Sequence, residues 1–327
     1  GLLYSAFTYY TGFKVNSGEY KLMGLAPYGN PIYADLIKEK IIDIKEDGSF
    51  WLDMRYFNFC TGLTMTSKKF HNLFGGPPRQ SESELSQRDM DLAASVQSVT
   101  EEIILKLGKS IAKETGQKNL CLAGGVALNC VANGKILDSG LFKNLWIQPA
   151  AGDAGGSLGA ALAYYHLEKN NERKILFPDS MNGSLLGPFY NDDNVEKSLN
   201  KCGANFKKLN ENDLLKKIAS DISQGKIVGW FQGRMEFGPR SLGNRAILAD
   251  PRKEEMQKKL NLKIKFRESF RPFAPSVLRE DVNDWFELNN ESPYMLLVSE
   301  VKKNKQIKMK AEDEKLFGID KLNVKRS

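Results

Sequence analysis

Three arginines in the stretch VGWFQGRMEFGPRSLGNRAILADPR, residues 228–252, have the type and spacing expected of an anion-binding loop. Arg234, Arg240 and Arg245 each lie close to a glycine, and an apolar run that predicts a short buried strand, residues 227–231, precedes them. Glycine lets backbone amides approach a bound anion, and a guanidinium group can pair with two phosphate or carboxylate oxygens. The pattern therefore favours a loop that binds phosphate or carboxylate.

A second cluster of arginines follows in KIKFRESFRPFAPSVLR, residues 263–279. Arg267 and Arg271 belong to this cluster, whereas we expect Arg279, like Arg252, to be a surface or ion-pair residue. Two such segments after a strand suit a nucleotide or an acyl phosphate. A solvated basic face is the alternative, but glycine, proline and aromatic residues interleave with the arginines.

A strand, a pair of glycines and a helix are predicted in succession in the first half of the chain. Residues 119–123 have the composition of a short strand, Gly124 and Gly125 follow, and residues 126–137, which include Asn129, have a helical pattern. Backbone amides and the dipole at a helix N-terminus can hold an anion. A simple tight turn explains such a glycine pair equally well.

A second unit of the same kind follows some 28 residues later. Its strand is predicted at residues 145–147, and its loop contains Gly152, Asp153 and Gly155 ahead of a helix at residues 157–165. Open α/β folds bind ligands in such loops, although Asp153 could instead cap the helix. Two units in tandem predict a nucleotide-binding α/β domain.

Hydrophobic periodicity and turn residues predict the other elements. Helices are predicted at residues 86–115, 213–223 and 253–260, and a strand at residues 293–301. Proline and glycine in residues 177–190 are typical of a linker, so we place a domain boundary near Ser180.

Charge is distributed unevenly on the two sides of this boundary. Residues 1–180 carry 19 basic and 19 acidic side chains and residues 181–327 carry 28 and 21, so the net charge of +7 lies in the second part. A chain of 327 residues is long enough for about two domains. A basic second domain fits a polyanionic ligand, such as a triphosphate or a nucleic acid.

No part of the sequence indicates membrane insertion or export. It has no run of about 18 apolar residues, and its start, GLLYSAFTYY, lacks the basic region and cleavage site of a signal peptide. We expect a cytoplasmic protein with buried, reduced cysteines at positions 60, 121, 130 and 202. Because the chain starts without methionine and stops at VKRS, we also expect an internal fragment of a longer protein.

Six blocks of the sequence resemble, in the same order, those of the NodU/CmcH carbamoyltransferase family. They are LYSAFTYYTGFKVNSGEYKLMGLAPYGNP, QRDMDLAASVQ, LAGGVALNCVANGKI, QPAAGDAGGSLGAALA, GRMEFGPRSLGNRAILADPR and ESFRPFAPSVL. The resemblance implies an α/β fold in two parts. An actin/Hsp70-like ATPase-fold lobe, residues 1–180, is followed by a YrdC-like α/β domain, residues 181–327, with a part of each missing.

The resemblance also implies a reaction. Members of the family use ATP to move a carbamoyl group from carbamoyl phosphate, through a carbamoyl adenylate, to a hydroxyl of a sugar or natural product. By resemblance, the adenylate-forming site contains Arg234, Arg240, Arg245, Lys263, Arg267 and Arg271. The nucleotide is expected to contact Gly124, Gly125, Asn129, Gly152, Gly155 and Arg326.

A divalent metal, iron or magnesium, is implied as well. Asp153 matches the metal-binding aspartate of the family, but His71 and His166 lie 95 residues apart and do not form the histidine pair of related enzymes. Tight sites for such ions need three or four ligands. We therefore expect an incomplete metal site, and a fragment that could be inactive alone.

Two other functions are compatible with the sequence. A tRNA threonylcarbamoyl-type enzyme would share both domain types, although the order of the domains and the GRMEFGPRSLGNR block favour the small-molecule transferase. A nucleic-acid-binding protein is suggested by the isoelectric point of about 9.0, but no RNA- or DNA-binding motif supports it. The acceptor does not follow from the sequence, and a homodimer stays open.

Overall fold

The computed structural model describes residues 1–177, 179–316 and 318–324 of the chain. These residues form a mixed α/β protein in which each sheet has two strands. Contacts divide the chain into two compact units. Unit 1 comprises Gly1–Trp146, Arg267–Asn289 and Leu297–Ser327, and unit 2 comprises Ile147–Phe266 and Asn290–Leu296. The domain boundary expected near Ser180 stays a prediction.

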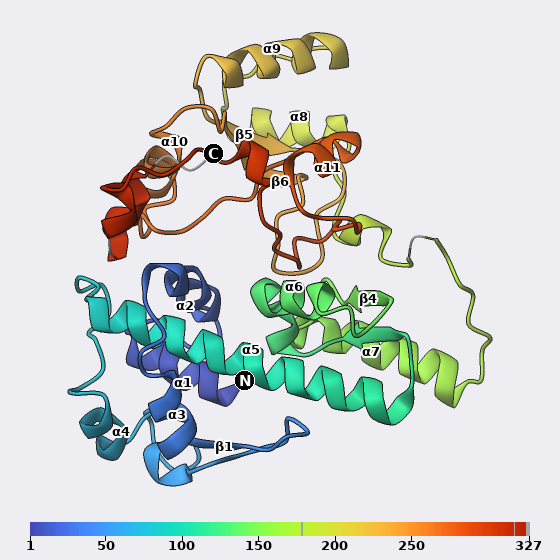
Figure 1. The fold of residues 1–327 in the computed structure, drawn as a ribbon. Helices are drawn as coiled ribbons and strands as arrows, with labels where there is room; N and C mark the ends of the chain where they lie inside the picture. The colour runs from blue at the N-terminus through green and yellow to red at the C-terminus, as the bar shows by residue number, and fades with distance from the viewer. Residues whose placement is uncertain (178, 317, 325–327) are drawn as a thin grey trace. The chain divides into compact units, whose positions relative to one another are not determined.

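The longest element of unit 1 is helix α5, Gln87–Thr115, which confirms the helix predicted at residues 86–115 (Figure 1). At its start, the Ser86 hydroxyl accepts a hydrogen bond from the Asp89 amide, and the Asp89 carboxylate accepts one from the Ser86 amide. Gly116 ends the helix with a φ of +65°, which glycine adopts without strain. Both ends of α5 therefore carry their expected sequence signals.

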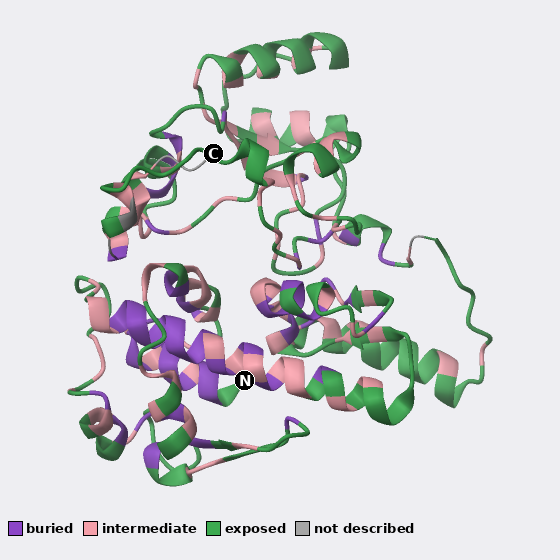
Figure 2. Ribbon diagram, viewed as in Figure 1, coloured by how far each residue is buried: buried purple, intermediate pink, exposed green. Residues whose placement is uncertain are grey.

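The hydrophobic core of unit 1 lies against the first half of α5. Helices α1 (Leu2–Tyr10), α2 (Glu19–Leu25) and α3 (Ala34–Lys40) pack on this half, where Figure 2 shows the buried residues gathered. Phe270, which belongs to the second arginine cluster, is buried in the same core. A segment far along the sequence thus contributes to the packing of the first helices.

The other strands and helices of unit 1 are short. The strands β1 (Ile42–Ile44) and β2 (Phe50–Leu52) pair antiparallel, and β3 (Asn119–Leu122) pairs with β4 (Asn144–Ile147). The short helices are α4 (Lys68–Leu73), α6 (Cys130–Asp138) and α11 (Val282–Trp285). Both strands predicted before the glycine loops therefore form.

Unit 2 contains one antiparallel strand pair and several helices. Its elements are α7 (Asp153–Ala163), α8 (Asp192–Lys201), α9 (Glu211–Ser223), β5 (Val228–Phe231), β6 (Arg245–Leu248) and α10 (Met256–Lys259). The strand predicted at residues 227–231 forms as β5, but the expectation that it is buried is wrong, because among the described residues its sheet contains just β5 and β6 and Phe231 is 56% exposed. Helix α9 confirms the prediction at residues 213–223.

Three other predicted elements differ from the structure. The helix expected at residues 126–137 breaks at Asn129, whose side chain caps α6. Residues 293–301 do not form a strand, because Met295 has a φ of +54°, which interrupts an extended backbone. The charged helix expected at residues 253–260 is confined to α10 before the helical turn Leu260–Ile264.

The cysteines are free thiols with more exposure than expected. Cys60, Cys121 and Cys202 are exposed and Cys130 is half-buried, so the prediction of buried thiols is wrong. The three exposed residues lie in a loop, in the short strand β3 and at the end of α8. None of the described helices combines the length and the apolar character that a membrane span requires.

Candidate anion-binding site

The arginine loop, residues 232–244, connects β5 with β6 and folds around a carboxylate of its own. Oε1 of Glu236 accepts hydrogen bonds from the amides of Leu242 at 2.9 Å, Asn244 at 2.8 Å and Arg245 at 3.2 Å. Burial acts to raise the pKa of Glu236, yet the hydrogen bonds from its own amide and from these three lower it below its ordinary value. Because these amides already donate to Glu236, an anion that binds the loop would interact with its guanidinium groups instead.

Arg245 fixes the two ends of the loop. Its guanidinium group donates to the carbonyl oxygens of Gln232 at 2.6 Å, Gly233 at 3.1 Å and Asn244 at 2.9 Å. The same group lies 3.5 Å from the centre of the Phe231 ring, a cation–π contact. Most of its hydrogen-bonding capacity is spent inside the protein, so Arg245 shapes the loop.

The other basic residues predicted for unit 2 differ in exposure. Arg234 is exposed and donates one hydrogen bond to the carbonyl oxygen of Gly187 at 2.9 Å. Arg240 is half-buried, and Lys263 is exposed in the helical turn after α10. Because an arginine has five N–H donors, Arg234 keeps donors that a dissolved anion can reach.

A second loop of unit 2 packs directly against the arginine loop. Gly238 has a φ of +131°, and a Cβ atom added to it would lie 3.1 Å from the carbonyl oxygen of Pro149. This approach requires glycine. Pro149 leads into the loop that carries Gly152 and Asp153, so two of the loops predicted to bind ligands lie side by side.

The loop after β4 is compact and ends at the start of α7. A Cβ atom added to Gly155 would lie 2.1 Å from the carbonyl oxygen of Ala150, which leaves no room for a side chain. Asp153 is exposed and is the first residue of the helix, after Gly152 at the N-cap position. The alternative role of Asp153 as a helix cap is therefore wrong, because the helix begins at Asp153 itself.

The described residues do not form a divalent-metal site. Among them, no three His, Cys, Asp or Glu side chains gather into a possible metal-binding group. The His71 ring lies 3.0 Å from the Thr66 hydroxyl, and the His166 ring lies 2.9 Å from the carbonyl oxygen of Asn171. Asp153 alone does not fit a tightly bound metal, which needs several ligands at fixed geometry.

The two glycines of the turn in unit 1 differ in their backbone conformation and in the space around them. Gly124 has a φ of +97° and a ψ of 160°, which only glycine adopts readily, whereas a Cβ atom added to Gly125 would meet nothing within 4 Å. Asn129 follows, and its Oδ1 atom accepts a hydrogen bond from the Ala132 amide at 3.1 Å. The turn therefore has open space beside Gly125 and a fixed end at Asn129.

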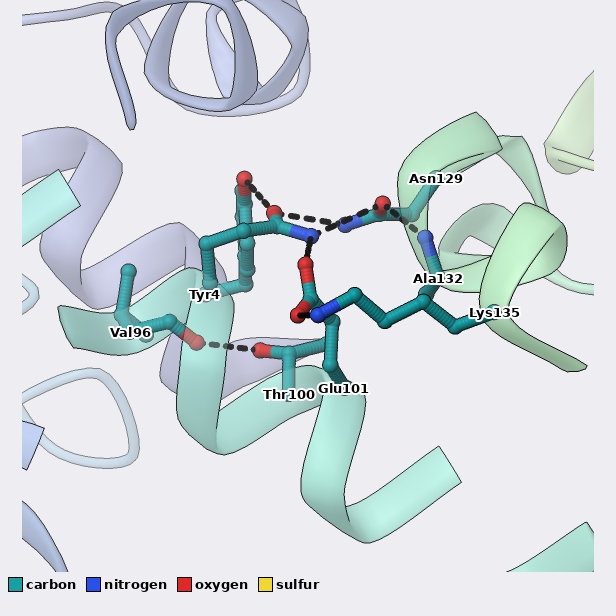
Figure 3. A network of polar contacts seen from close by, with 8 residues as sticks. Tyr4, Val96, Thr100, Glu101, Asn129, Ala132 and Lys135 are labelled. Carbon is teal, nitrogen blue, oxygen red and sulfur yellow. Dashed lines mark hydrogen bonds and ion pairs between the residues drawn. The ribbon is translucent and has the colours of Figure 1, made fainter. Parts of the chain in front are cut away.

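Asn129 also belongs to a buried polar network, shown in Figure 3. Its carboxamide exchanges hydrogen bonds with Gln97 of α5, and Gln97 in turn contacts Tyr4 and Glu101. Glu101 forms an ion pair with Lys135 at 2.5 Å. The side chain predicted to contact a nucleotide thus has structural partners inside unit 1.

The second arginine cluster, which contains Arg267 and Arg271, lies at the start of the second segment of unit 1, Arg267–Asn289. Glu268 pairs with Lys21 at 2.7 Å, and the Arg271 guanidinium lies 4.6 Å from the centre of the Tyr20 ring. Burial lowers the pKa of Arg267, and the positive charge of Arg271 lowers it further. The six predicted basic residues are therefore divided, with two in unit 1 and four in unit 2. Arg326 lies outside the described residues.

Glu236 and Gln97 are among the residues at these sites that the sequence patterns do not single out. Glu236 is the one acidic side chain among the glycines and arginines of residues 232–245, which could have marked it as an internal ion partner. Gln97 lies in the QRDMDLAASVQ block, where the buried residues of the helix are both apolar and polar, and nothing in its spacing marks it.

Comparisons with known proteins agree with the resemblance seen in the sequence blocks. The family described as carbamoyltransferase N-terminus matches residues 1–162, and the one described as carbamoyltransferase C-terminus matches residues 219–313. The two matches include the glycine turn, the loop at Asp153 and the arginine loop. The chain belongs to the carbamoyltransferase family.

Several relatives match over most of the chain. An uncharacterized protein of Synechocystis is 60% identical over 100% of this chain and 54% of its own length. The nodulation protein NolNO of Sinorhizobium fredii is 38% identical over 94% of this chain and 43% of its own length. The nodulation protein NolO of Bradyrhizobium diazoefficiens is 38% identical over 88% and 50%, respectively. The chain thus spans about half the length of these curated relatives.

Proposed function

We propose that this protein is an ATP-dependent O-carbamoyltransferase, which moves a carbamoyl group from carbamoyl phosphate to a hydroxyl of a sugar or another natural product. The observation that carries the proposal is a basic loop in a chain of the carbamoyltransferase family. This loop is braced by Glu236 and Arg245, and it presents Arg234 and Arg240 beside the loop at Pro149.

The proposed reaction has two stages. Carbamoyl phosphate is first hydrolysed to carbamate and inorganic phosphate. A carbamate oxygen attacks the α-phosphate of ATP, which forms the carbamoyl adenylate and releases pyrophosphate. The acceptor hydroxyl then attacks the carbamoyl carbon, so that AMP leaves and the hydroxyl proton passes to solvent or a base.

Charge explains why basic residues suit the first stage. Carbamate and ATP are both anions and repel each other. Fixed positive groups that face both of them lower the free-energy cost of bringing them together, most of all where negative charge accumulates in the transition state. Arg234 and Arg240 of unit 2 are the residues that we assign to this role, with Lys263 at the edge. Arg245 and Glu236 hold the loop in shape, and Arg267 and Arg271 are assigned to anion binding in unit 1.

The second stage is assigned to unit 1, for which we expect the actin-like fold of the family. There the open space beside Gly125 and the N-terminus of α6 suit a phosphate group. The YrdC-like fold is expected for the part that forms the adenylate. No step is assigned to a metal, since Asp153 is not part of a group of three possible metal ligands among the described residues.

The test is to supply the whole protein with ATP and carbamoyl phosphate and to measure pyrophosphate release. We expect release only when both substrates are present, and a loss of roughly ten- to a hundred-fold in Arg240→Ala, from a charge-assisted contact of about 1.5–3 kcal/mol. Arg252→Ala is the matched control, because Arg252 pairs with Asp250 at 2.8 Å and is not assigned to substrate. Equal release from both variants would remove Arg240 from the site.

A further inference from the structure

The carboxamide of Gln97 uses all of its hydrogen-bonding capacity inside unit 1. Its oxygen accepts from the Tyr4 hydroxyl at 2.9 Å and from Nδ2 of Asn129 at 2.9 Å. Its nitrogen donates to Oε1 of Glu101 at 2.8 Å and to Oδ1 of Asn129 at 3.1 Å. A primary amide has two donors and two acceptor sites, so this set is complete.

The orientation of the side-chain amides of Gln97 and Asn129 is fixed by neighbouring groups that can only accept or only donate a hydrogen bond. The Glu101 carboxylate, which Lys135 holds at 2.5 Å, only accepts, so the nitrogen of Gln97 must face it. At the other end, the Ala132 amide only donates, so the oxygen of Asn129 must face it. An amide flip at either residue would set two like groups against each other.

This pair connects helix α5 to the glycine turn. Asn129 ends the 3-10 helix Gly125–Leu128 and caps α6, and Gln97 holds Asn129 in that position. Gln97 and Asn129 are 5% and 8% exposed, so solvent does not replace a lost partner. The turn is also held by a hydrogen bond from the Ala127 amide to the Gly124 carbonyl oxygen and by one from Nδ2 of Asn133 to the Ala127 carbonyl oxygen at 2.8 Å.

We propose that Gln97 is a positioning residue, which sets the turn at residues 124–129 for a nucleotide phosphate. The ligand in this statement rests on the proposed function, whereas the positioning of the turn does not. Gln97 acts through Asn129 and reaches the turn from the buried face of a neighbouring helix.

The experiment compares Gln97→Met with Thr100→Val in otherwise unaltered protein. Methionine has a similar size but no amide. Thr100 lies on the same helix and donates only to the Val96 carbonyl at 2.7 Å, so its loss tests the helix without the turn (Figure 3). Hydrogen–deuterium exchange reports on the amides of residues 125–132, and titration with AMP, the nucleotide part of the carbamoyl adenylate, reports on binding at the turn.

We expect Gln97→Met to speed exchange at residues 125–132 by about ten-fold or more, while Thr100→Val leaves it unchanged. AMP affinity should fall about ten-fold in Gln97→Met, and pyrophosphate release, which is assigned to the arginine loop of unit 2, should change less than two-fold. A purely structural role would lower melting temperature and turnover together. Unchanged exchange at the turn in folded Gln97→Met would overturn the proposal.

A second variant covers the case in which Gln97→Met does not fold. Gln97→Asn keeps a buried amide but is one methylene too short to reach Glu101 and Asn129 together, and the same exchange pattern is expected. If the unaltered protein binds no AMP, the proposed function of the turn fails. The exchange comparison still decides whether Gln97 positions it.

Discussion

Oε1 of Glu236 lies 2.8 Å from the backbone nitrogen of Asn244, across the width of the arginine loop. A charge-assisted hydrogen bond of this kind is about twice as strong as a neutral one. Glu236 therefore supplies the anion around which the loop folds, before any ligand binds. We propose that the loop shaped in this way holds the exposed guanidinium group of Arg234 where a substrate anion can reach it.

The pH dependence of stability should report on Glu236. Its folded-state pKa is lowered, so its contribution is present above the ordinary value of about 4.3 and is lost as the pH falls through the folded value. Glu236→Gln should lower the free energy of unfolding by about 1–3 kcal/mol at pH near 7. Urea denaturation of both proteins should show this gap closing in acid. A gap that stays constant with pH would contradict the assignment.

The two glycines of the turn in unit 1 should respond differently to alanine. Gly124→Ala places a side chain on a φ of +97° and should cost on the order of 1–3 kcal/mol. Gly125→Ala meets open space, so its melting temperature should match that of the unaltered protein. Weaker AMP binding by folded Gly125→Ala would support a phosphate at this turn, and unaltered affinity would reduce it to a simple turn.

A second matched pair lies in the loop at the start of α7. Gly155→Ala should destabilise unit 2 by about 1–3 kcal/mol, because its Cβ atom would overlap the carbonyl oxygen of Ala150 at 2.1 Å. Gly156→Ala meets nothing within 4 Å and should stabilise the helix by about 0.5–1 kcal/mol. Thermal unfolding of both variants checks the pair, and similar losses from both would show that the loop packs otherwise.

Alkaline pH should weaken unit 2 through Tyr294. Its hydroxyl donates to both carboxylate oxygens of Asp179, at 2.9 and 2.8 Å, and burial with this contact raises the pKa of Tyr294 to about 12. A raised pKa means that the stabilisation is complete below the ordinary value of about 10 and is lost as the pH rises through the folded value.

Tyr294→Phe should therefore be less stable than the unaltered protein near neutral pH, by about 1.5–3 kcal/mol for a hydrogen bond to a charged group. Its free energy of unfolding should not show the decline between pH values of about 10 and 12. Denaturation followed across this range measures both effects. A decline of equal size in the two proteins would assign the alkaline transition to other groups.

Local signals in the sequence predict the elements that depend on local interactions. Helix α5 follows from its apolar spacing, the capping pair Ser86 and Asp89, and Gly116. The helix expected at residues 126–137 is interrupted at Asn129, because the Asn129 side chain caps α6 and forms hydrogen bonds with Gln97. An asparagine in a helical pattern gives no sign of either role. That partner is 32 residues away, where periodicity carries no information.

The candidate site shows the same limit. The arginines of residues 232–245 are visible as a pattern, but the pattern does not say that Arg245 spends its donors on Gln232, Gly233 and Asn244. Arg267 and Arg271 fall in a different unit from that loop because Phe270, between them, is buried with the first helices. Burial partners of this kind are decided by the three-dimensional packing.

The chain crosses between the two units four times, since unit 1 is interrupted after Trp146 and again after Asn289. A single cut therefore cannot release either unit whole. Exchanging the second half of this chain for that of a relative would also exchange Phe270, whose ring lies 6.5 Å from that of Phe13 and 6.2 Å from that of Tyr28. A chimaera that exchanges unit 2 must therefore carry both of its segments, Ile147–Phe266 and Asn290–Leu296, and leave Phe270 with the helices on which it packs.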